Sequence, residues 1–217
     1  MTISKFGVDY FMTMYGHNYE RRNPRHKWRS FLRELLKHKA GGNLLEIGCG
    51  FGLFLREAAL HFNCTGCDIS EYAVTQAYHK LPPDVHLFCG ELGHLPMKHT
   101  FDVVAAFDVI EHIADLKQVF NDFARVLRPD GVLIFTVPVY DGPLGWLANR
   151  LDRDTTHIHR CELSFWLQHI IPQFNVKHYT GIWRYFLFGR FYFNRVSYFS
   201  RRWTTAVLII ANKMNIP

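Results

Sequence analysis

The last 55 residues of this 217-residue chain contain neither aspartate nor glutamate. All 19 acidic residues lie in residues 1–162, together with 18 of the 25 lysines and arginines. The formal net charge of +6 therefore originates in the C-terminal quarter, where seven basic residues have no acidic counterpart. A segment that carries only positive charge favours contact with an anionic surface.

Long hydrophobic runs and a secretory leader pattern are also missing. The longest aliphatic stretch near the end of the chain, Ala206–Ala211, is too short to cross a bilayer. The five cysteines are irregularly spaced and form no disulfide framework. Cys64 and Cys67 lie inside an expected strand, which indicates core packing rather than a redox pair or a metal site. These absences predict a cytoplasmic protein in a reducing compartment.

Apolar residues at helical spacing predict an amphipathic helix over about Pro24–Lys39. The residues that set this spacing are Trp28, Phe31, Leu32, Leu35 and Leu36. The opposite face carries five basic side chains that we expect to be solvated, namely Arg25, Lys27, Arg29, Arg33 and Lys37. The N-terminal 40 residues are therefore expected to end in a helix that packs on the rest of the domain.

Short apolar runs alternate with helical patterns along the rest of the chain. We expect strands at about residues 43–47, 64–68, 85–88, 101–107, 132–137, 174–179 and 204–211. Further helices are expected at about residues 54–59, 71–80, 116–127 and 162–170. This alternation predicts a doubly wound, Rossmann-like α/β fold. Its seven-stranded sheet should be mainly parallel, with an antiparallel last strand.

Glycines and carboxylates gather where the expected strands end. Residues 44–52 read Leu-Leu-Glu-Ile-Gly-Cys-Gly-Phe-Gly, a buried strand that stops in a glycine-rich turn and opens a helix. Such a turn lets backbone N–H groups approach a ligand closely. Asp68 ends the second strand, Glu91 follows the third and Asp108 follows the fourth. Because ligands of these sheets bind beyond the carboxyl ends of the strands, we expect these groups to share one crevice.

The glycine spacing distinguishes between two kinds of cofactor. A nicotinamide fingerprint needs glycine at position 53, where this chain has Leu53. The sequence Gly48-x-Gly50-x-Gly52, preceded by Glu46, instead resembles motif I of class I S-adenosylmethionine-dependent methyltransferases. A nicotinamide-dependent reductase is therefore disfavoured.

Four further motifs follow in the order typical of the small-molecule branch of that family, which includes the ubiquinone-biosynthesis type O-methyltransferases. They are Gly90-Glu91-Leu92 ahead of Leu95-Pro96, Phe101-Asp102-Val103-Val104, the run from Asp108 to Ile113 and the run from Arg125 to Gly131. The resemblance covers residues 43–138 closely and residues 155–213 more loosely. It implies S-adenosyl-L-methionine as the cofactor and S-adenosyl-L-homocysteine as the product.

The resemblance also implies which residues bind that cofactor: Tyr15, Glu46, Gly48, Cys49, Gly50, Gly52, Asp68, Ile69, Glu91, Leu92, Phe107 and Asp108. Glu46 would face the ammonium group, and Asp68 would accept hydrogen bonds from both ribose hydroxyls. Each carboxylate has a structural alternative. Glu46 and Asp68 could cap the turn and the next helix, Glu91 could be a solvated loop residue, and Asp108 could cap a short helix at residues 109–113.

Histidines near the expected crevice are the candidate catalytic residues. Methyl transfer to a hydroxyl group benefits from a general base, and an imidazole suits that role near neutral pH. His112 follows the fourth strand, and His157 lies in the segment that usually covers the acceptor in this family. Glu111 and His112, with Asp108, would also permit a weak metal site. Adjacent helical residues diverge, however, so we predict no metal.

The least ordinary segment, residues 177–202, combines ten aromatic and six basic residues without an acid. Such a composition suits an anionic membrane surface or a lipid-like acceptor. A substrate lid or a dimer contact is the alternative, and nucleic acid is disfavoured because no RNA-binding module is recognisable.

We therefore expect one methyltransferase domain over residues 1–217. Its parts are an N-terminal lid and helix (1–40), a cofactor-binding core (43–138) and an acceptor-side region (139–217). Its expected function is methyl transfer to a small or lipid-like acceptor, at oxygen, in the cytoplasm or peripherally at a membrane. A non-catalytic module that binds the same nucleoside ligand is the alternative.

Overall fold

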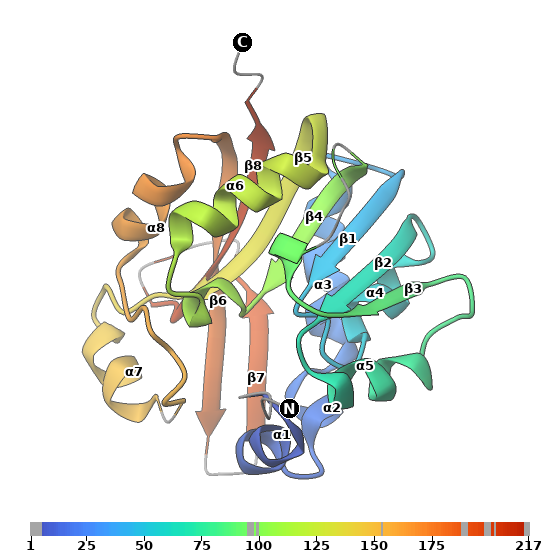
Figure 1. Ribbon diagram of the computed structural model, residues 1–217. Coiled ribbons are helices and arrows are strands. Elements are labelled where there is room, and N and C mark those ends of the chain that lie inside the picture. The colour runs from blue at the N-terminus through green and yellow to red at the C-terminus, as the bar shows by residue number, and fades with distance from the viewer. Residues whose placement is uncertain are drawn as a thin grey trace.

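The computed structural model of the protein contains one eight-stranded sheet with helices packed on both of its faces (Figure 1). It describes residues 6–94, 98, 100–152, 154–187, 191–197, 201 and 203–214. The strands are β1 (Asn43–Ile47), β2 (Asn63–Asp68), β3 (His86–Cys89), β4 (Phe101–Phe107), β5 (Leu127–Pro138), β6 (Phe174–Leu187), β7 (Phe191–Val196) and β8 (Ala206–Lys213).

The helices alternate with the strands through most of the chain. The α-helices are α1 (Val8–Tyr15), α2 (Tyr19–Arg22), α3 (Arg25–Leu36), α4 (Leu53–Ala58), α5 (Glu71–Tyr78), α6 (Leu116–Val126), α7 (Gly145–Leu151) and α8 (Leu163–Ile170). Two short 3₁₀ helices are η1 (Leu92–His94) and η2 (Ile110–His112). None of the described helices has the length and hydrophobicity needed to span a bilayer.

The strand order is β3-β2-β1-β4-β5-β8-β6-β7. The five strands from β3 to β5 pair in parallel, whereas β8, β6 and β7 add antiparallel pairs. The chain moves outward from β1 through β2 to β3, and then returns to pair β4 with the other side of β1. This reversal places a crevice at the carboxyl ends of β1 and β4. The predicted doubly wound, mainly parallel fold is confirmed.

The sequence predicted seven strands, and this number is wrong. The sixth predicted strand ends near Tyr179, but β6 continues to Leu187 and pairs with β7 from Ile182–Val196 to Leu187–Phe191. The aromatic residues of this segment have high strand propensity. The segment also has the mixed aromatic and basic composition that suits a membrane contact or a lid. Neither property alone shows that the segment folds back as a strand pair.

The position of β4 between two hydrophobic cores explains why its sequence is almost continuously apolar. Val104 and Ala106 pack into the core beneath α6 and α8, whereas Val103 and Ala105 pack into the core beneath α3 and α4. Successive side chains of a strand point to opposite faces, so a strand covered on both sides must be apolar at every position. The first four predicted strands match β1 to β4 within one residue at each end.

Side chains cap the starts of two helices that follow strands of the sheet. The Oγ of Ser70 accepts a hydrogen bond from the amide N–H of Ala73 at the start of α5, at 3.2 Å. At the start of α6, Oδ1 of Asp115 accepts one from the amide of Gln118, at 2.9 Å. Each cap satisfies an amide that has no partner within its helix. These helices follow β2 and β4, so the caps also fix the chain just beyond two strand ends.

Candidate active site

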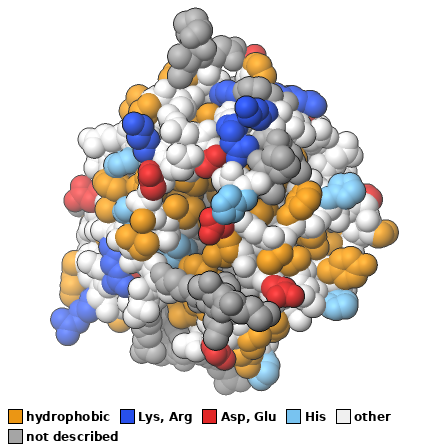
Figure 2. All heavy atoms as spheres, in the orientation of Figure 1, with side chains coloured by type: hydrophobic (Ala, Val, Ile, Leu, Met, Phe, Trp, Pro, Cys, Tyr) orange, Lys and Arg blue, Asp and Glu red, His pale blue; other side chains and the backbone are white. Residues whose placement is uncertain are grey.

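A cavity of about 540 Å³ opens at the carboxyl ends of the parallel strands. Its size falls within the range of about 300–1,000 Å³ that is typical of small-molecule sites. The predicted site residues that line it are Tyr15, Glu46, Gly48, Cys49, Gly50, Asp68, Ile69, Glu91, Leu92, Phe107, Asp108 and His112. Gly52 and His157 are not among the lining residues. On the face of the molecule shown in Figure 2, hydrophobic side chains are interspersed with acidic and histidine side chains across the middle.

The glycine turn after β1 closes one end of the cavity. Gly50 has a φ of +52°, and a Cβ built on it would lie only 2.2 Å from the Oη of Tyr19. Both the left-handed backbone and the close approach of Tyr19 therefore require glycine. Gly52 has a φ of +72° and is the N-cap of α4, so its conformation serves the start of that helix.

Asp68, at the end of β2, is hydrogen-bonded to this turn. Its Oδ2 accepts from the amide of Gly50 at 2.8 Å, and its Oδ1 accepts from the amide of Ser70 at 2.9 Å. Burial raises the pKa of Asp68, although these backbone hydrogen bonds oppose the increase. Each carboxylate oxygen can accept a further hydrogen bond. The carboxylate therefore fixes the turn and can still receive two donors from a ligand.

Glu46 is the buried carboxyl group of the site. It lies on β1 with 2% of its surface exposed, and its Oε2 has no hydrogen-bond partner among the described residues. Burial raises the pKa of Glu46, and the nearby Asp68 carboxylate raises it further. Buried polar atoms in folded proteins are nearly always hydrogen-bonded. An unpartnered carboxyl oxygen beside a cavity therefore fits a ligand that carries a cationic N–H donor.

Asp108 follows β4 with a left-handed backbone, at a φ of +59°. Its Oδ1 accepts hydrogen bonds of 2.7 Å from both Arg184 and Thr136, and its Oδ2 lies 3.4 Å from the Nζ of Lys27. Burial works against the ionised form, but Arg184 and Lys27 hold the pKa of Asp108 well below its usual range. The predicted alternative, a cap for the short helix, is not the role that these contacts describe. Asp108 instead joins α3, β4 and β6.

Lys27 corrects the expectation of a solvated basic face on α3. Only 2% of its surface is exposed, whereas Arg25 and Arg29 are exposed and bind Glu57. Its Nζ lies 3.0 Å from the Oδ1 of Asn23 and 4.2 Å from the ring centroid of Trp28. Burial lowers its pKa to about 8 despite the neighbouring Asp108 carboxylate. Lys27 adjoins Trp28 in sequence, and this proximity to the apolar stripe was the available signal.

Aromatic side chains of the N-terminal segment line the cavity next to the glycine turn. The ring of Phe11 on α1 lies 5.1 Å from that of Phe51, and the ring of Tyr19 lies 4.1 Å from Phe51. The Oη of Tyr10 donates a hydrogen bond of 3.0 Å to Asp154, which follows α7. The N-terminal segment that lines the cavity is therefore hydrogen-bonded to the acceptor-side region of the predicted domain.

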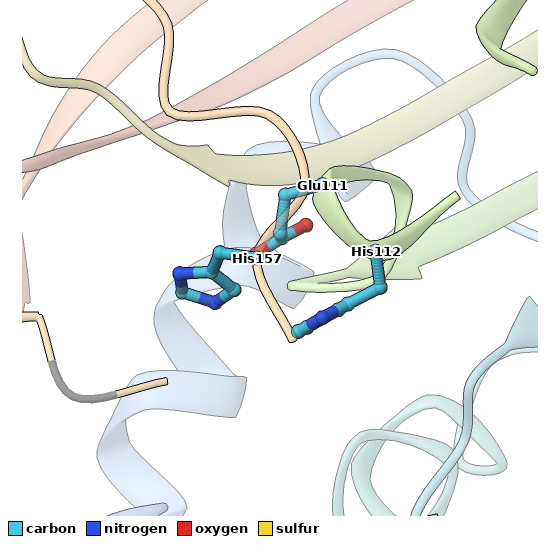
Figure 3. A group of neighbouring side chains, drawn as sticks. All are labelled: Glu111, His112 and His157. Atoms are coloured by element: carbon cyan, nitrogen blue, oxygen red, sulfur yellow. The ribbon is translucent and has the colours of Figure 1, made fainter. Parts of the chain in front are cut away.

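Two histidines meet at the acceptor side of the cavity. His112 on η2 and His157 in the loop between α7 and α8 have ring centroids 4.8 Å apart. The carboxyl group of Glu111 points toward both rings (Figure 3). The loop is fixed to η2 because the amides of Ile158 and His159 both donate to the carbonyl of Glu111, at 2.9 and 3.2 Å.

The hydrogen-bond partners determine which ring nitrogens carry a proton. Thr156 donates its hydroxyl proton to Asp154 at 2.5 Å, so its oxygen accepts from Nδ1 of His112 at 2.9 Å. Nδ1 of His157 lies 2.6 Å from the Asp152 carboxylate, which also accepts from the hydroxyl of Tyr140. Both imidazoles in their neutral form therefore keep the proton on Nδ1 and a lone pair on Nε2.

Electrostatics keep His112 neutral and Asp152 ionised. Burial lowers the pKa of His112, and the neighbouring His157 lowers it further. For Asp152, burial opposes ionisation, but hydrogen bonds from His157 and Tyr140 bring its pKa down to about 2. Asp152, Thr156 and Tyr140 were missed by sequence reasoning, because no motif marks them.

Only part of the basic and aromatic segment is described. Lys177 and Arg195 are exposed, and Tyr179 is 45% exposed. Arg184 turns inward to Asp108, and Arg201 pairs with Asp141 at 3.0 Å. Several aromatic and basic residues of this segment, and two residues of the motif after β3, lie outside the described residues or side chains: Leu95, Pro96, Tyr185, Phe186, Phe188, Arg190, Phe191, Tyr192, Phe193, Tyr198, Phe199 and Arg202.

Sequence comparisons place the central part of the chain in a known family. Residues 45–135 match a family model described as a methyltransferase domain. The chain is 28% identical over 174 residues to the sterol 24-C-methyltransferase ERG6B of Gibberella zeae, over 76% of this chain and 43% of that protein. It is 33% identical over 127 residues to a ubiquinone biosynthesis O-methyltransferase of a Caulobacter species, over 48% of each. The chain therefore spans less than half the length of either relative.

A solved structure shares the fold. The N-methyltransferase NodS of Bradyrhizobium japonicum, crystallised with S-adenosyl-L-homocysteine, superimposes with a TM-score of 0.63 at 16% identity. The match covers 87% of this chain and 86% of NodS. Residues 45–135 therefore match the methyltransferase domain family, and the chain shares its fold with S-adenosylmethionine-dependent methyltransferases of class I.

Proposed function

We propose that this chain transfers the methyl group of S-adenosyl-L-methionine to a hydroxyl group of a small or lipid-like acceptor. The observation that carries the proposal is the convergence of the glycine turn, Glu46 and Asp68 on one cavity. S-Adenosyl-L-methionine, when bound, supplies a methyl group on a positively charged sulfur that leaves readily. The protein then has to hold the two reactants in line, exclude water and accept a proton.

The charged groups of the cavity match that cofactor from one end to the other. The unpartnered Oε2 of Glu46 fits the ammonium group, and the buried ammonium of Lys27 fits the carboxylate. Asp68 fits the ribose hydroxyls because its two oxygens are already fixed by the amides of Gly50 and Ser70. Glu91 and Leu92 line the cavity farther along, where an adenine ring would lie.

His112 is the proposed general base when no metal ion is bound to the protein. A lone pair on the acceptor oxygen forms the new C–O bond to the methyl carbon as the C–S bond breaks, and its electron pair stays on sulfur. The hydroxyl proton passes to Nε2 of His112, the nitrogen left unprotonated by the contact with Thr156. The ring of His157 packs against that of His112 and is itself held by Asp152. We propose that this contact orients the ring of His112.

The relatives do not by themselves select the methylated atom, because their names include methylation of carbon, oxygen and nitrogen. A neutral imidazole next to the cavity supports oxygen. A hydroxyl must lose its proton to become a good nucleophile, whereas an alkene carbon has no such proton to lose beforehand.

The first experiment measures cofactor binding and turnover together. We expect S-adenosyl-L-homocysteine, and not NADH, to raise the melting temperature of the purified chain. Asp68→Ala should weaken calorimetric affinity for S-adenosyl-L-homocysteine at least tenfold, because charge-assisted hydrogen bonds contribute about 1.5–3 kcal/mol each. Asp84→Ala, an exposed carboxylate elsewhere, is the matched control. Equal affinity in Asp68→Ala and the wild type would contradict the proposed site.

Turnover separates an enzyme from a binding module. Purified protein should release S-adenosyl-L-homocysteine when incubated with S-adenosyl-L-methionine and the right member of a panel of quinols, phenols, sterols and lipids. Mass spectrometry of the acceptor identifies the methylated atom. Tight binding of S-adenosyl-L-homocysteine without turnover on any acceptor would instead support a non-catalytic role.

The exposed part of the basic segment supports a lipid-like acceptor reached at a membrane surface. Lys177, Tyr179 and Arg195 are exposed on the antiparallel end of the sheet, and no acid follows residue 162. Basic side chains are attracted to anionic lipid, and aromatic rings partition into the headgroup region. We therefore propose a cytoplasmic protein that binds such a surface peripherally.

A further inference from the structure

We propose that Glu111, His112 and His157 bind a divalent transition-metal ion. One potential ligand atom from each of these side chains lies within 4.8 Å of the other two. Two imidazoles and one carboxylate form a donor set that suits zinc or iron better than magnesium or calcium. Figure 3 shows the three side chains facing one another from two different segments.

The unsatisfied carboxyl oxygen of Glu111 is an independent observation that points to a ligand. Glu111 is 1% exposed, and its Oε2 is buried without a hydrogen-bond partner among the described residues. Leaving such a buried oxygen unpaired is unfavourable, and more so if it is charged. A cation between this oxygen and the two rings would remove that cost.

The ring nitrogens that could bind an ion are left available by the surrounding hydrogen bonds. Nδ1 of His157 is held by the Asp152 carboxylate at 2.6 Å, and Nδ1 of His112 is held by the Thr156 hydroxyl at 2.9 Å. Metal-binding histidines almost always donate their second ring N–H to a carboxylate or another oxygen, which fixes the tautomer and the ring. Both Nε2 lone pairs are therefore available for coordination.

Neighbouring negative charge supports a cation at this place. The Oδ2 of Asp154 lies 3.8 Å from Nε2 of His157, so two hydrogen-bond acceptors face each other there. Donor atoms around an ion with bonds of about 2.1 Å lie roughly 3–3.5 Å apart. From separations of up to 4.8 Å, the ligand atoms would have to approach one another by up to roughly 1.5 Å, a movement that small side-chain rotations can supply.

Asp108 does not belong to this site, although sequence reasoning grouped it with Glu111 and His112. Its oxygens are occupied by Arg184, Thr136 and Lys27. The sequence argument against a metal was that a single loop supplies too few ligands. Because the amides of residues 158 and 159 fix the second loop to η2, the fold provides the missing third ligand.

Ion binding does not depend on the proposed methyl transfer, whereas a part in catalysis rests on it. His112 lines the cavity, so an ion bound there would reach an acceptor oxygen as a further ligand. Coordination would lower the pKa of the acceptor hydroxyl, and its proton would leave to a water molecule. Coordination uses the same Nε2 that accepts the proton in the metal-free protein, so the ion would replace His112 as the means of deprotonation.

The test measures binding of Zn²⁺ alone to the full chain, after removal of bound ions with EDTA and desalting. We expect one ion per chain at micromolar affinity or tighter, and no binding of Mg²⁺ under the same conditions. Glu111→Gln and His157→Ala should each weaken the affinity for Zn²⁺ at least tenfold. Asp152→Asn should weaken it by roughly 10–100-fold, because it removes the carboxylate that orients His157.

Two controls keep the result specific. His86→Ala, an exposed histidine on β3, should leave Zn²⁺ affinity unchanged, and S-adenosyl-L-homocysteine affinity should be unchanged in Glu111→Gln if the variant is folded. The proposal is overturned if no Zn²⁺ binds at micromolar concentration, or if binding is the same in Glu111→Gln and His157→Ala as in the wild type. Methyl transfer by a protein that binds no Zn²⁺ would overturn only the metal site. Ion binding without any methylated acceptor would contradict only the proposed function.

Discussion

Lys27 differs from the other basic residues of α3 in its surroundings. Its ammonium lies against the ring of Trp28 and beside Asp108, whereas Arg25 and Arg29 pair with Glu57 at the exposed surface of the helix. A lysine is seldom fully buried without a partner, and here the partner is the carboxylate that ends β4. The same ammonium lines the proposed cofactor cavity.

The lowered pKa of Lys27 predicts a pH-dependent contribution to stability. Its folded pKa is about 8, below the ordinary value of 10.5, so the unfolded chain binds more protons between these two values. The free energy of unfolding should therefore rise with pH from about 8 to 10.5 relative to a variant without this group. The size of the effect is on the order of 3 kcal/mol at most.

Urea unfolding of the wild type and Lys27→Met at several pH values measures this difference. Arg184 still neutralises Asp108 in the variant, so the comparison does not leave a bare buried carboxylate. A constant difference between the two proteins over pH 8–10.5 would contradict the prediction.

His112 predicts the pH dependence of turnover in the metal-free enzyme. Burial and His157 lower its pKa below the ordinary value of 6.5, so the imidazole stays neutral to a lower pH than a solvated histidine. In the presence of EDTA, kcat/KM should remain constant on acidification until pH falls below 6.5, and then decline. His112→Ala should reduce kcat by about 10²–10⁴-fold and remove this decline, without changing affinity for S-adenosyl-L-homocysteine.

At the scale of elements, short helices were the hardest to predict. A lid was expected in the N-terminal 40 residues, but α1 and α2 were not predicted as helices, and neither was α7. Helices of this length are stabilised mainly by tertiary contacts rather than by intrinsic propensity. By contrast, α3, α5 and α6 combine longer apolar stripes or clear caps, and their positions were predicted closely.

The hydrogen bond between Tyr10 and Asp154 predicts how α1 is held over the cavity. Tyr10→Phe removes a bond of 3.0 Å that joins the lid to the acceptor-side loop. Such a bond contributes about 0.5–1.5 kcal/mol, or somewhat more to an ionised carboxylate, so global stability should change little. Amide hydrogen exchange in residues 8–15 should accelerate, and the KM for S-adenosyl-L-methionine should rise severalfold. Tyr78→Phe, at a tyrosine that is 74% exposed, is the control.

For the whole molecule, the uneven charge distribution predicts salt-dependent binding to anionic vesicles. Co-sedimentation with phosphatidylserine-containing vesicles should be strong at low ionic strength and weak above about 0.5 M salt, where screening is nearly complete at contact distances. Charge reversal at two exposed positions, Lys177→Glu with Arg195→Glu, should reduce binding more than Lys117→Glu, which lies on α6. Absence of binding at low salt would remove the proposed membrane contact.

The local pattern of the sequence determined the order of strands and helices, the position of the glycine turn and the placement of carboxylates at the strand ends. Parallel strands bring their carboxyl ends to one edge, so these groups had to converge once the fold class was recognised. Tertiary structure alone decided the burial of Lys27, the eighth strand and the meeting of Glu111 with His157. The partners Arg184 and Asp108 are 76 residues apart, and Thr156 and His112 are 44 apart. Contacts across such distances depend on how complete elements pack, which periodicity within one element does not specify.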